Sequence, residues 1–336
     1  MRTSRSEFVS LRARRHHVRV WGEAGAPTFF FLHGWGDVGA SFQFAVDALQ
    51  GNWRIIAPDW RGFGQSQWNE GPYVFADYIA DLDALLTHYS PVQPVQIAGH
   101  SLGGIVASLY AGIRPERVSR FANLEGFGLW VSAPGETPDR FGKWLQQIRD
   151  NNPAFRPYAN REDYAVRLCA DNPRLTPARA AFLADHSLRE VDTDPGASAG
   201  FVFAADPRHR WISPVLYPLE EAKACWRRVS APTLWVAGRD SKIMKQFADR
   251  PDDYRERMAC FSQVEERLID NCGHNLHHDQ PEIIANLLDD FFRATCTSML
   301  TDMDSAHLAG LGSSLTTRCP GSHRVAVISA RPRRAE

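Results

Sequence analysis

The chain has 336 residues, of which 44% are hydrophobic and 23% are charged. This composition allows a large buried core and excludes a disordered or fibrous protein, so we expect one large domain with an insertion, or two smaller domains. The formal net charge of -1 excludes the broad positive field that non-specific nucleic-acid binding requires. A small-molecule substrate, and no nucleic acid, is the expected partner.

The apolar and cysteine content bears on where the protein is expected to work. The apolar run at 29–32 is far too short to cross a bilayer, so no integral membrane association is expected. The six cysteines form no Cys-x-x-Cys pair and no zinc-ligand spacing. Free thiols in a reducing cytoplasm are therefore expected, with an extracellular disulfide as the alternative. The cysteines are Cys169, Cys225, Cys260, Cys272, Cys296 and Cys319.

Strand and helix patterns alternate through the first third of the chain. A partly alternating segment predicts an edge strand at 18–21, and short apolar runs predict strands at 28–32, 54–57, 95–98 and 118–124. Apolar residues at helical spacing predict helices around 42–49, 78–86 and 102–111. This order predicts an α/β fold with a mostly parallel central sheet and helices on both faces.

The alternation stops after residue 125 and resumes near residue 213. The intervening segment 126–212 is helix-prone and rich in proline and arginine, and we expect it to form an inserted helical cap, or lid. The core is thus expected to comprise residues 1–125 and 213–295, with further strands at 233–237 and 266–269. The tail, 296–336, is rich in small and polar residues and is expected to be disordered and irrelevant to catalysis.

A Gly-x-Ser-x-Gly motif lies between a predicted strand and a predicted helix, at Gly99-His100-Ser101-Leu102-Gly103. In such a strand-turn-helix elbow the nucleophile adopts a strained backbone, and small flanking residues allow the strand and helix to approach. The helix N-terminus directs free N–H groups toward an oxyanion formed at the serine. Ser101 is therefore the candidate nucleophile.

A serine hydroxyl needs a base within hydrogen-bonding reach. His274 follows the last predicted strand in Asn271-Cys-Gly-His274, where a loop side chain can lie over the elbow. The neighbouring His277 and His278 are interpreted as ordinary loop residues. His274 is therefore the candidate general base.

The base requires an acceptor on its other ring nitrogen. Asp240 follows the strand 233–237 in Gly238-Arg-Asp240, and the order Ser101, Asp240, His274 matches the Ser, acid, His succession of such enzymes. Capping of the next helix is the alternative role of Asp240. Glu125 also follows a strand and is the alternative acid.

These motifs together resemble the α/β-hydrolase superfamily over residues 18 to 293. Two further motifs contribute to this resemblance: His33-Gly-Trp-Gly36 and the structural turn Asp59-x-Arg-Gly-x-Gly-x-Ser66. Within the superfamily, His33-Gly-Trp-Gly-Asp37 and Asp206-Pro-Arg-His-Arg210 resemble the serine hydrolase-like branch, which is related to haloalkane dehalogenases and epoxide hydrolases. Those relatives use aspartate at the elbow, so Ser101 argues against both activities. Gly238-Arg-Asp240 is one residue shorter than the commoner Gly-x-x-Asp.

The resemblance implies an acyl-enzyme on Ser101 and no metal or organic cofactor. It also implies an oxyanion hole made by the backbone N–H groups of Trp35 and Leu102. Aromatic residues of the segment after residue 125, among them Phe127, Trp130 and Trp144, are candidates for an apolar substrate pocket or for packing of the cap on the core.

The predicted function is hydrolysis of a carboxylic ester, or a related acyl bond, of a small to medium apolar substrate. Two alternatives stay open. One is cleavage or formation of a carbon–carbon bond, as in meta-cleavage-product hydrolases or the menaquinone-pathway synthase, for which Arg61 or Lys242 would have to bind a carboxylate at the site. The other is a non-catalytic protein with the hydrolase fold.

Overall fold

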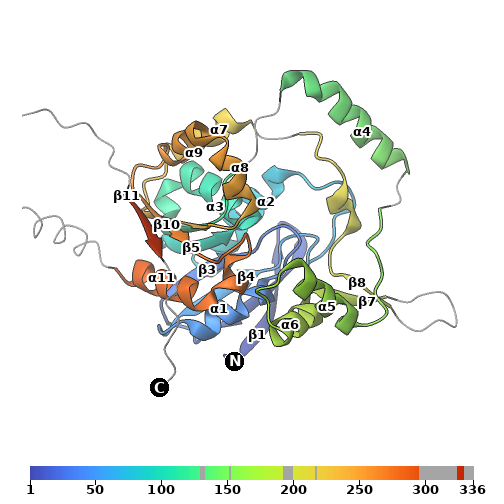
Figure 1. The fold of residues 1–336 in the computed structure, drawn as a ribbon, viewed down its shortest axis with the longest axis horizontal. Helices are drawn as coiled ribbons and strands as arrows, with labels where there is room; N and C mark the ends of the chain where they lie inside the picture. The colour runs from blue at the N-terminus through green and yellow to red at the C-terminus, as the bar shows by residue number, and fades with distance from the viewer. Residues whose placement is uncertain (129–132, 151–152, 192–199, 216–217, 295–323, 329–336) are drawn as a thin grey trace, which may run out of the picture.

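The computed structural model describes residues 1–128, 133–150, 153–191, 200–215, 218–294 and 324–328. Its centre is a nine-stranded sheet in the order β1-β2-β4-β3-β5-β6-β9-β10-β11, with helices on both faces (Figure 1). β2 runs antiparallel to β1 and β4, and the other neighbouring strands run parallel. The predicted α/β class with a mostly parallel sheet is therefore confirmed. The strands of this sheet are β1 (Ser4–Leu11), β2 (Arg14–Trp21), β3 (Thr28–Leu32), β4 (Arg54–Pro58), β5 (Val95–His100), β6 (Val118–Leu124), β9 (Thr233–Gly238), β10 (Val264–Ile269) and β11 (Arg324–Ile328).

Strand β3 shows why both faces of the sheet must be covered. Its side chains alternate between the faces, so that Phe30 and Leu32 join one hydrophobic cluster while Phe29 and Phe31 join the other. The first cluster contains residues of α2, α3 and α7, and the second contains residues of α1, α10 and α11. The core helices are α1 (Gln43–Ala48), α2 (Phe75–Tyr89), α3 (Leu102–Ile113), α7 (Leu219–Trp226), α8 (Lys242–Ala248), α9 (Pro251–Met258), α10 (Leu276–Asp279) and α11 (Pro281–Arg293).

The strand at the N-terminal edge of the sheet is not the predicted one. The segment 18–21 is part of β2, and β1 lies outside it as the edge strand. The sequence did not predict β1, because the strand is mostly polar and only its Val9 and Leu11 are buried hydrophobic residues. Edge strands often carry charged side chains, which discourage pairing with other chains.

The described part of the segment between β6 and α7 contains three α-helices, two short 3-10 helices and a two-stranded sheet. The α-helices are α4 (Thr137–Asp150), α5 (Arg161–Asp171) and α6 (Pro177–Ser187), and the sheet is the antiparallel pair β7 (Leu188–Val191) and β8 (Gly200–Phe203). Figure 1 shows α5 and α6 together at one end of the core and α4 projecting away from it. The helices match the expected helical cap, whereas the β7–β8 pair was not predicted.

Part of the tail joins the main sheet. β11 pairs in parallel with β10, so the expectation of a disordered tail is wrong for residues 324–328. The rest of the predicted tail, 296–323 and 329–336, lies outside the described residues, as do Cys296 and Cys319. The four cysteines in the described part of the chain are free thiols. No helix of the described residues is long and apolar enough to cross a bilayer.

The turn Asp59–Ser66 is structural, as its sequence predicts. The buried Asp59 carboxylate accepts hydrogen bonds from the backbone N–H groups of Gly39 and Gln65, and His17 Nδ1 lies 2.7 Å from it. Ser66 Oγ donates to the Asp59 carbonyl. These bonds tie the end of β4 to β2 and to the segment after β3.

Close contact between α3 and the sheet depends on glycine. A Cβ atom on Gly103 would overlap the backbone carbonyl oxygen of Leu32 in β3, whereas a Cβ atom on Gly142, in the exposed helix α4, would meet no atom outside its own stretch of helix within 4 Å. Backbone cannot move aside as a flexible side chain can. The first turn of α3 can therefore lie against β3 only if residue 103 is glycine.

We predict opposite effects for the same substitution at these two glycines. Gly103→Ala should lower the free energy of unfolding by about 3 kcal/mol because of overpacking against β3. Gly142→Ala should raise it by up to about 1 kcal/mol because alanine favours a helix interior. Urea unfolding followed by tryptophan fluorescence measures both, and equal stabilities of the two variants would contradict the proposed contact.

Candidate active site

Ser101 lies at a sharp turn between β5 and α3. Its backbone has φ 48° and ψ −115°, a left-handed conformation that is unusual for a residue with a side chain. Gly99 allows this turn, because a Cβ atom there would lie 2.6 Å from the carbonyl carbon of Gly103. The predicted strand-turn-helix elbow is therefore present, with Ser101 at the N-terminus of α3.

His274 lies over the elbow, on the loop that follows β10. Its Nε2 atom is 3.0 Å from Ser101 Oγ. The carbonyl oxygen of His274 is 2.9 Å from Nε2 of His100, the residue before the serine. Since a carbonyl only accepts, His100 carries a proton on Nε2. Burial lowers the pKa of His100 well below its usual value, with the nearby His277 adding to the effect, so His100 is neutral and ties the histidine loop to the elbow.

Glu125 is the carboxylate that contacts His274. Its Oε2 atom is 2.9 Å from His274 Nδ1, and only 1% of the residue is exposed. Glu125 follows β6 directly and has φ 60°. Because the carboxylate accepts a hydrogen bond from Nδ1–H, the neutral histidine presents the lone pair of Nε2 to the serine hydroxyl.

The expected pairing of Asp240 with His274 is wrong. The Asp240 side chain is 39% exposed, and its carboxylate lies 2.5 Å from the guanidinium of Arg174, in the segment between α5 and α6. The loop that carries Asp240 supplies hydrogen-bond donors instead. The Gly238 N–H donates to Glu125 Oε1 at 2.8 Å, and Ser241 Oγ–H donates to Oε2 at 2.6 Å.

Part of this arrangement could be predicted from the order of the strands. β6 and β9 are neighbours in the sheet and run parallel, so the residues after both strands lie at the same edge. Glu125 was therefore a possible acid from the start. Its buried donors, Gly238 and Ser241, were missed because their function depends on a partner 113 and 116 residues away.

The turn after β3 lies against the serine. A Cβ atom on Gly34 would be 3.1 Å from Ser101 Cβ. The Leu102 N–H belongs to the first residue of α3 and has no acceptor within its own helix. Among the backbone hydrogen bonds of the described residues, neither Trp35 nor Leu102 acts as a donor. This leaves the two N–H groups that were expected to form the oxyanion hole without backbone acceptors.

A cavity of about 290 Å³ opens at Ser101 and His274, and we call it the serine cavity. The core contributes residues such as Trp35 and Asp37 to its wall, and α5 and α6 contribute Tyr164 and Leu183. The segment that was expected to form the lid therefore covers the nucleophile.

The predicted aromatic pocket residues lie elsewhere. Phe127 does not line the serine cavity and is 2% exposed, because the chain is still within the core at that point and the ring packs against Trp235, Phe247 and Tyr254. Trp144 lies on the projecting helix α4 and does not line the cavity either. Trp130 lies outside the described residues.

A cluster of three side chains beside the site is of the types that can bind a metal ion. Asp37, His100 and His277 offer ligand atoms within 4.8 Å of one another. The Asp37 carboxylate already accepts a hydrogen bond from Ser41 Oγ at 2.7 Å and lies 3.4 Å from His277 Nε2. Burial opposes ionisation of Asp37, but the nearby histidines hold its pKa well below the usual value. These contacts tie the turn after β3 to α10.

Comparisons with known proteins agree with this geometry. The family model described as alpha/beta hydrolase fold matches residues 27–281. The chain belongs to the α/β-hydrolase family.

Individual relatives share much of this chain. A serine hydrolase-like protein of Danio rerio is 28% identical over 307 residues, which cover 87% of this chain and 90% of that protein. A 3-hydroxybutyrate-oligomer hydrolase of Cupriavidus necator is 28% identical over 235 residues, covering 67% and 76% of the two chains. Among solved structures, the thioesterase domain from the curacin biosynthetic pathway has the same fold, with a TM-score of 0.74, 22% identity, and coverage of 85% and 99%.

The two acidic candidates differ in a way that mutagenesis can measure. Glu125→Gln should slow labelling of the serine by a fluorophosphonate by about 10⁴-fold, because an amide there no longer holds the reactive tautomer. Asp240→Asn should leave the labelling rate nearly unchanged, since Asp240 contacts Arg174. Rates are measured on folded variants by gel fluorescence against time. The opposite ranking would return the role of the acid to Asp240.

Proposed function

We propose that this protein is a serine hydrolase that cleaves carboxylic esters through an acyl-enzyme on Ser101. The observation that carries the proposal is the continuous chain from Ser101 Oγ to His274 Nε2, at 3.0 Å, and from His274 Nδ1 to Glu125 Oε2, at 2.9 Å. Each member has the chemistry that its position requires: a nucleophile, a base, and a buried carboxylate that orients the base.

Acylation begins when His274 Nε2 takes the proton of Ser101 Oγ as this oxygen attacks the ester carbonyl carbon. The resulting oxyanion accepts hydrogen bonds from the Trp35 and Leu102 N–H groups, and each such donor stabilises the transition state by about 3 kcal/mol. Glu125 stabilises the imidazolium. The imidazolium then gives its proton to the leaving alcohol oxygen, and the bond between that oxygen and the carbonyl carbon breaks.

Deacylation repeats these steps with water. His274 removes a proton from the water as its oxygen attacks the acyl carbon. Collapse of the second tetrahedral intermediate breaks the bond to Ser101 Oγ, which recovers its proton from His274. The carboxylic acid leaves, and the serine is regenerated.

The surroundings of the site favour an ester over the carbon–carbon alternative. A substrate carboxylate would need a basic residue, and the two candidates lie elsewhere: Arg61 pairs with Asp77 and Asp81, and Lys242 is exposed at the start of α8. The similar proteins include a hydrolase of 3-hydroxybutyrate oligomers and a thioesterase domain, which also supports acyl-bond hydrolysis.

The assembled geometry also weighs against the non-catalytic alternative. A scaffold protein has no need of a strained serine, or of a buried glutamate that receives three hydrogen bonds from Gly238, Ser241 and His274. Strained residues and buried charges both lower stability and are concentrated at active sites.

Replacement of the nucleophile tests the proposal. Ser101→Ala should abolish both fluorophosphonate labelling and turnover of p-nitrophenyl esters while leaving the fold intact, because no other group can form the acyl-enzyme. Ser90→Ala, at the half-buried C-cap of α2, is the matched control and should behave as wild type. Labelling that persists in a folded Ser101→Ala protein would refute the assignment.

A further inference from the structure

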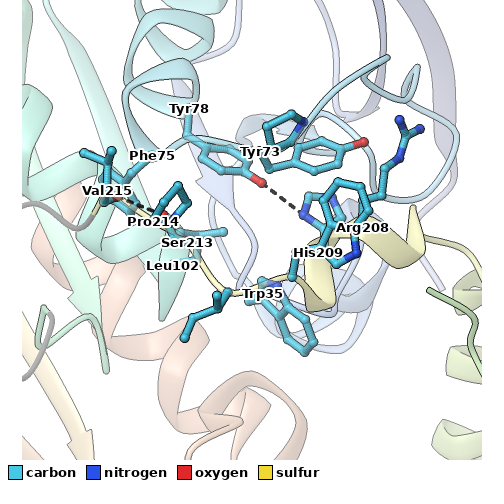
Figure 2. Close-up of a pocket in the computed structure, with 13 residues that line it drawn as sticks. Trp35, Tyr73, Phe75, Tyr78, Leu102, Arg208, His209, Ser213, Pro214 and Val215 are labelled. Carbon is cyan, nitrogen blue, oxygen red and sulfur yellow. Dashed lines mark hydrogen bonds between the residues drawn. The ribbon is translucent and has the colours of Figure 1, made fainter. Parts of the chain in front are cut away.

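A second cavity adjoins the serine cavity. It has a volume of about 180 Å³, and we call it the aromatic cavity because Tyr73, Phe75 and Tyr78 line it (Figure 2). Trp35 lines both cavities, and Leu102, the residue after the nucleophile, lines the aromatic cavity. The two spaces therefore meet at the residues that carry the proposed oxyanion donors.

Several polar groups that line the aromatic cavity are paired within the protein. The Tyr78 hydroxyl lies 3.4 Å from His209 Nδ1 (Figure 2). The Tyr73 hydroxyl donates to Asp206 Oδ2, behind the cavity wall, at 2.8 Å. Arg208 forms a salt bridge with Asp206 at 2.7 Å. Burial lowers the pKa of His209 to about 4, so this ring is neutral near pH 7. The wall therefore favours an uncharged, apolar group.

The serine cavity has a different lining. Asp37, Asp171, Asn172 and Asn275 bring carboxylate and amide groups to it, and none of its described lining residues is lysine or arginine. Such a wall can hydrogen-bond hydroxyl groups and repels anions. The two cavities therefore suit the two halves of an ester that differ in polarity.

The position of His274 determines which half of the ester binds in which cavity. In the proposed mechanism His274 gives its proton to the leaving alcohol oxygen, so the alcohol must lie on the histidine side. His274 lines the serine cavity and not the aromatic cavity. The acyl substituent then points away from the histidine, past Trp35 and Leu102.

We propose that the aromatic cavity binds a compact apolar acyl group and that the serine cavity binds a hydroxyl-bearing, non-anionic alcohol. This inference rests on the proposed ester hydrolysis and adds the class and orientation of the substrate. A cavity of about 150 Å³ lined by apolar side chains holds one benzene ring. The aromatic cavity therefore suits an acyl group of about one ring, such as benzoyl.

Two isomeric esters test the orientation of the substrate, because the aromatic and the hydroxyl-bearing groups are exchanged between their acyl and alcohol halves. 2-Hydroxyethyl benzoate has the aromatic acyl group and the hydroxyl-bearing alcohol, whereas benzyl glycolate has the reverse. Each kcat/KM is divided by the rate constant of alkaline hydrolysis, which corrects for intrinsic reactivity. The corrected value should be at least about 10-fold higher for 2-hydroxyethyl benzoate, the size of effect that one poorly fitting group produces.

Variants that fill one cavity at a time test where each half of the ester binds. Ile212→Trp should lower kcat/KM for 2-hydroxyethyl benzoate about 10-fold or more and should affect 2-hydroxyethyl acetate little, because acetyl does not need the aromatic cavity. Val215→Trp, at a site that is 63% exposed, is a second variant that the fold should tolerate. Leu168→Trp fills the serine cavity and should slow both of these esters to a similar extent, because they share the same alcohol.

The outcomes separate this inference from the function on which it rests. A preference for benzyl glycolate, or equal loss on both hydroxyethyl esters in the aromatic-cavity variants, would overturn the orientation. Turnover of neither isomer by an enzyme whose Ser101 still reacts with fluorophosphonate would overturn the substrate class and leave the serine hydrolase proposal standing. Absence of labelling would overturn the proposed function itself.

Discussion

The buried carboxylate of Glu125 is the constraint on which the rest of the site depends. An ionised group with 1% exposure is costly unless hydrogen bonds replace the lost water. Three donors do so here: the Gly238 N–H, the Ser241 hydroxyl and His274 Nδ1–H. The need to satisfy this carboxylate fixes the ends of β6 and β9 and the orientation of His274 together.

Polar contacts at the same edge of the sheet join the segment between α5 and α6 to the site. Arg174 contacts Asp240 and Asn271, which flank the histidine loop, and Asn172 donates to Asp279, whose carboxylate also accepts the Gly273 N–H. The segment between α5 and α6 is thus hydrogen-bonded to the loop that presents His274. The segment that lines the serine cavity and the loop that presents His274 are therefore joined by a few polar contacts, and Asp240 belongs to these contacts.

The sequence was most informative where a function depends on neighbours in the chain. The elbow could be predicted because Gly99, Ser101 and Gly103 lie within one turn, and the alternating strands and helices indicated the sheet. The sequence alone could not decide which residue pairs with His274, because Asp240 and Glu125 both follow parallel strands that end at the same edge of the sheet. Only the distances to His274 distinguish them. Phe127 was misplaced because it is the last core residue before the cap, and β1 was missed because it buries only two apolar residues among mostly polar ones.

The most direct measurement is the proton NMR resonance of His274 Nδ1–H in the resting enzyme. A proton shared between an imidazole and a buried carboxylate is strongly deshielded and protected from exchange. The account predicts such a resonance in the wild type and in Asp240→Asn, and its loss in Glu125→Gln. A resonance that survives in Glu125→Gln and disappears in Asp240→Asn would contradict the account.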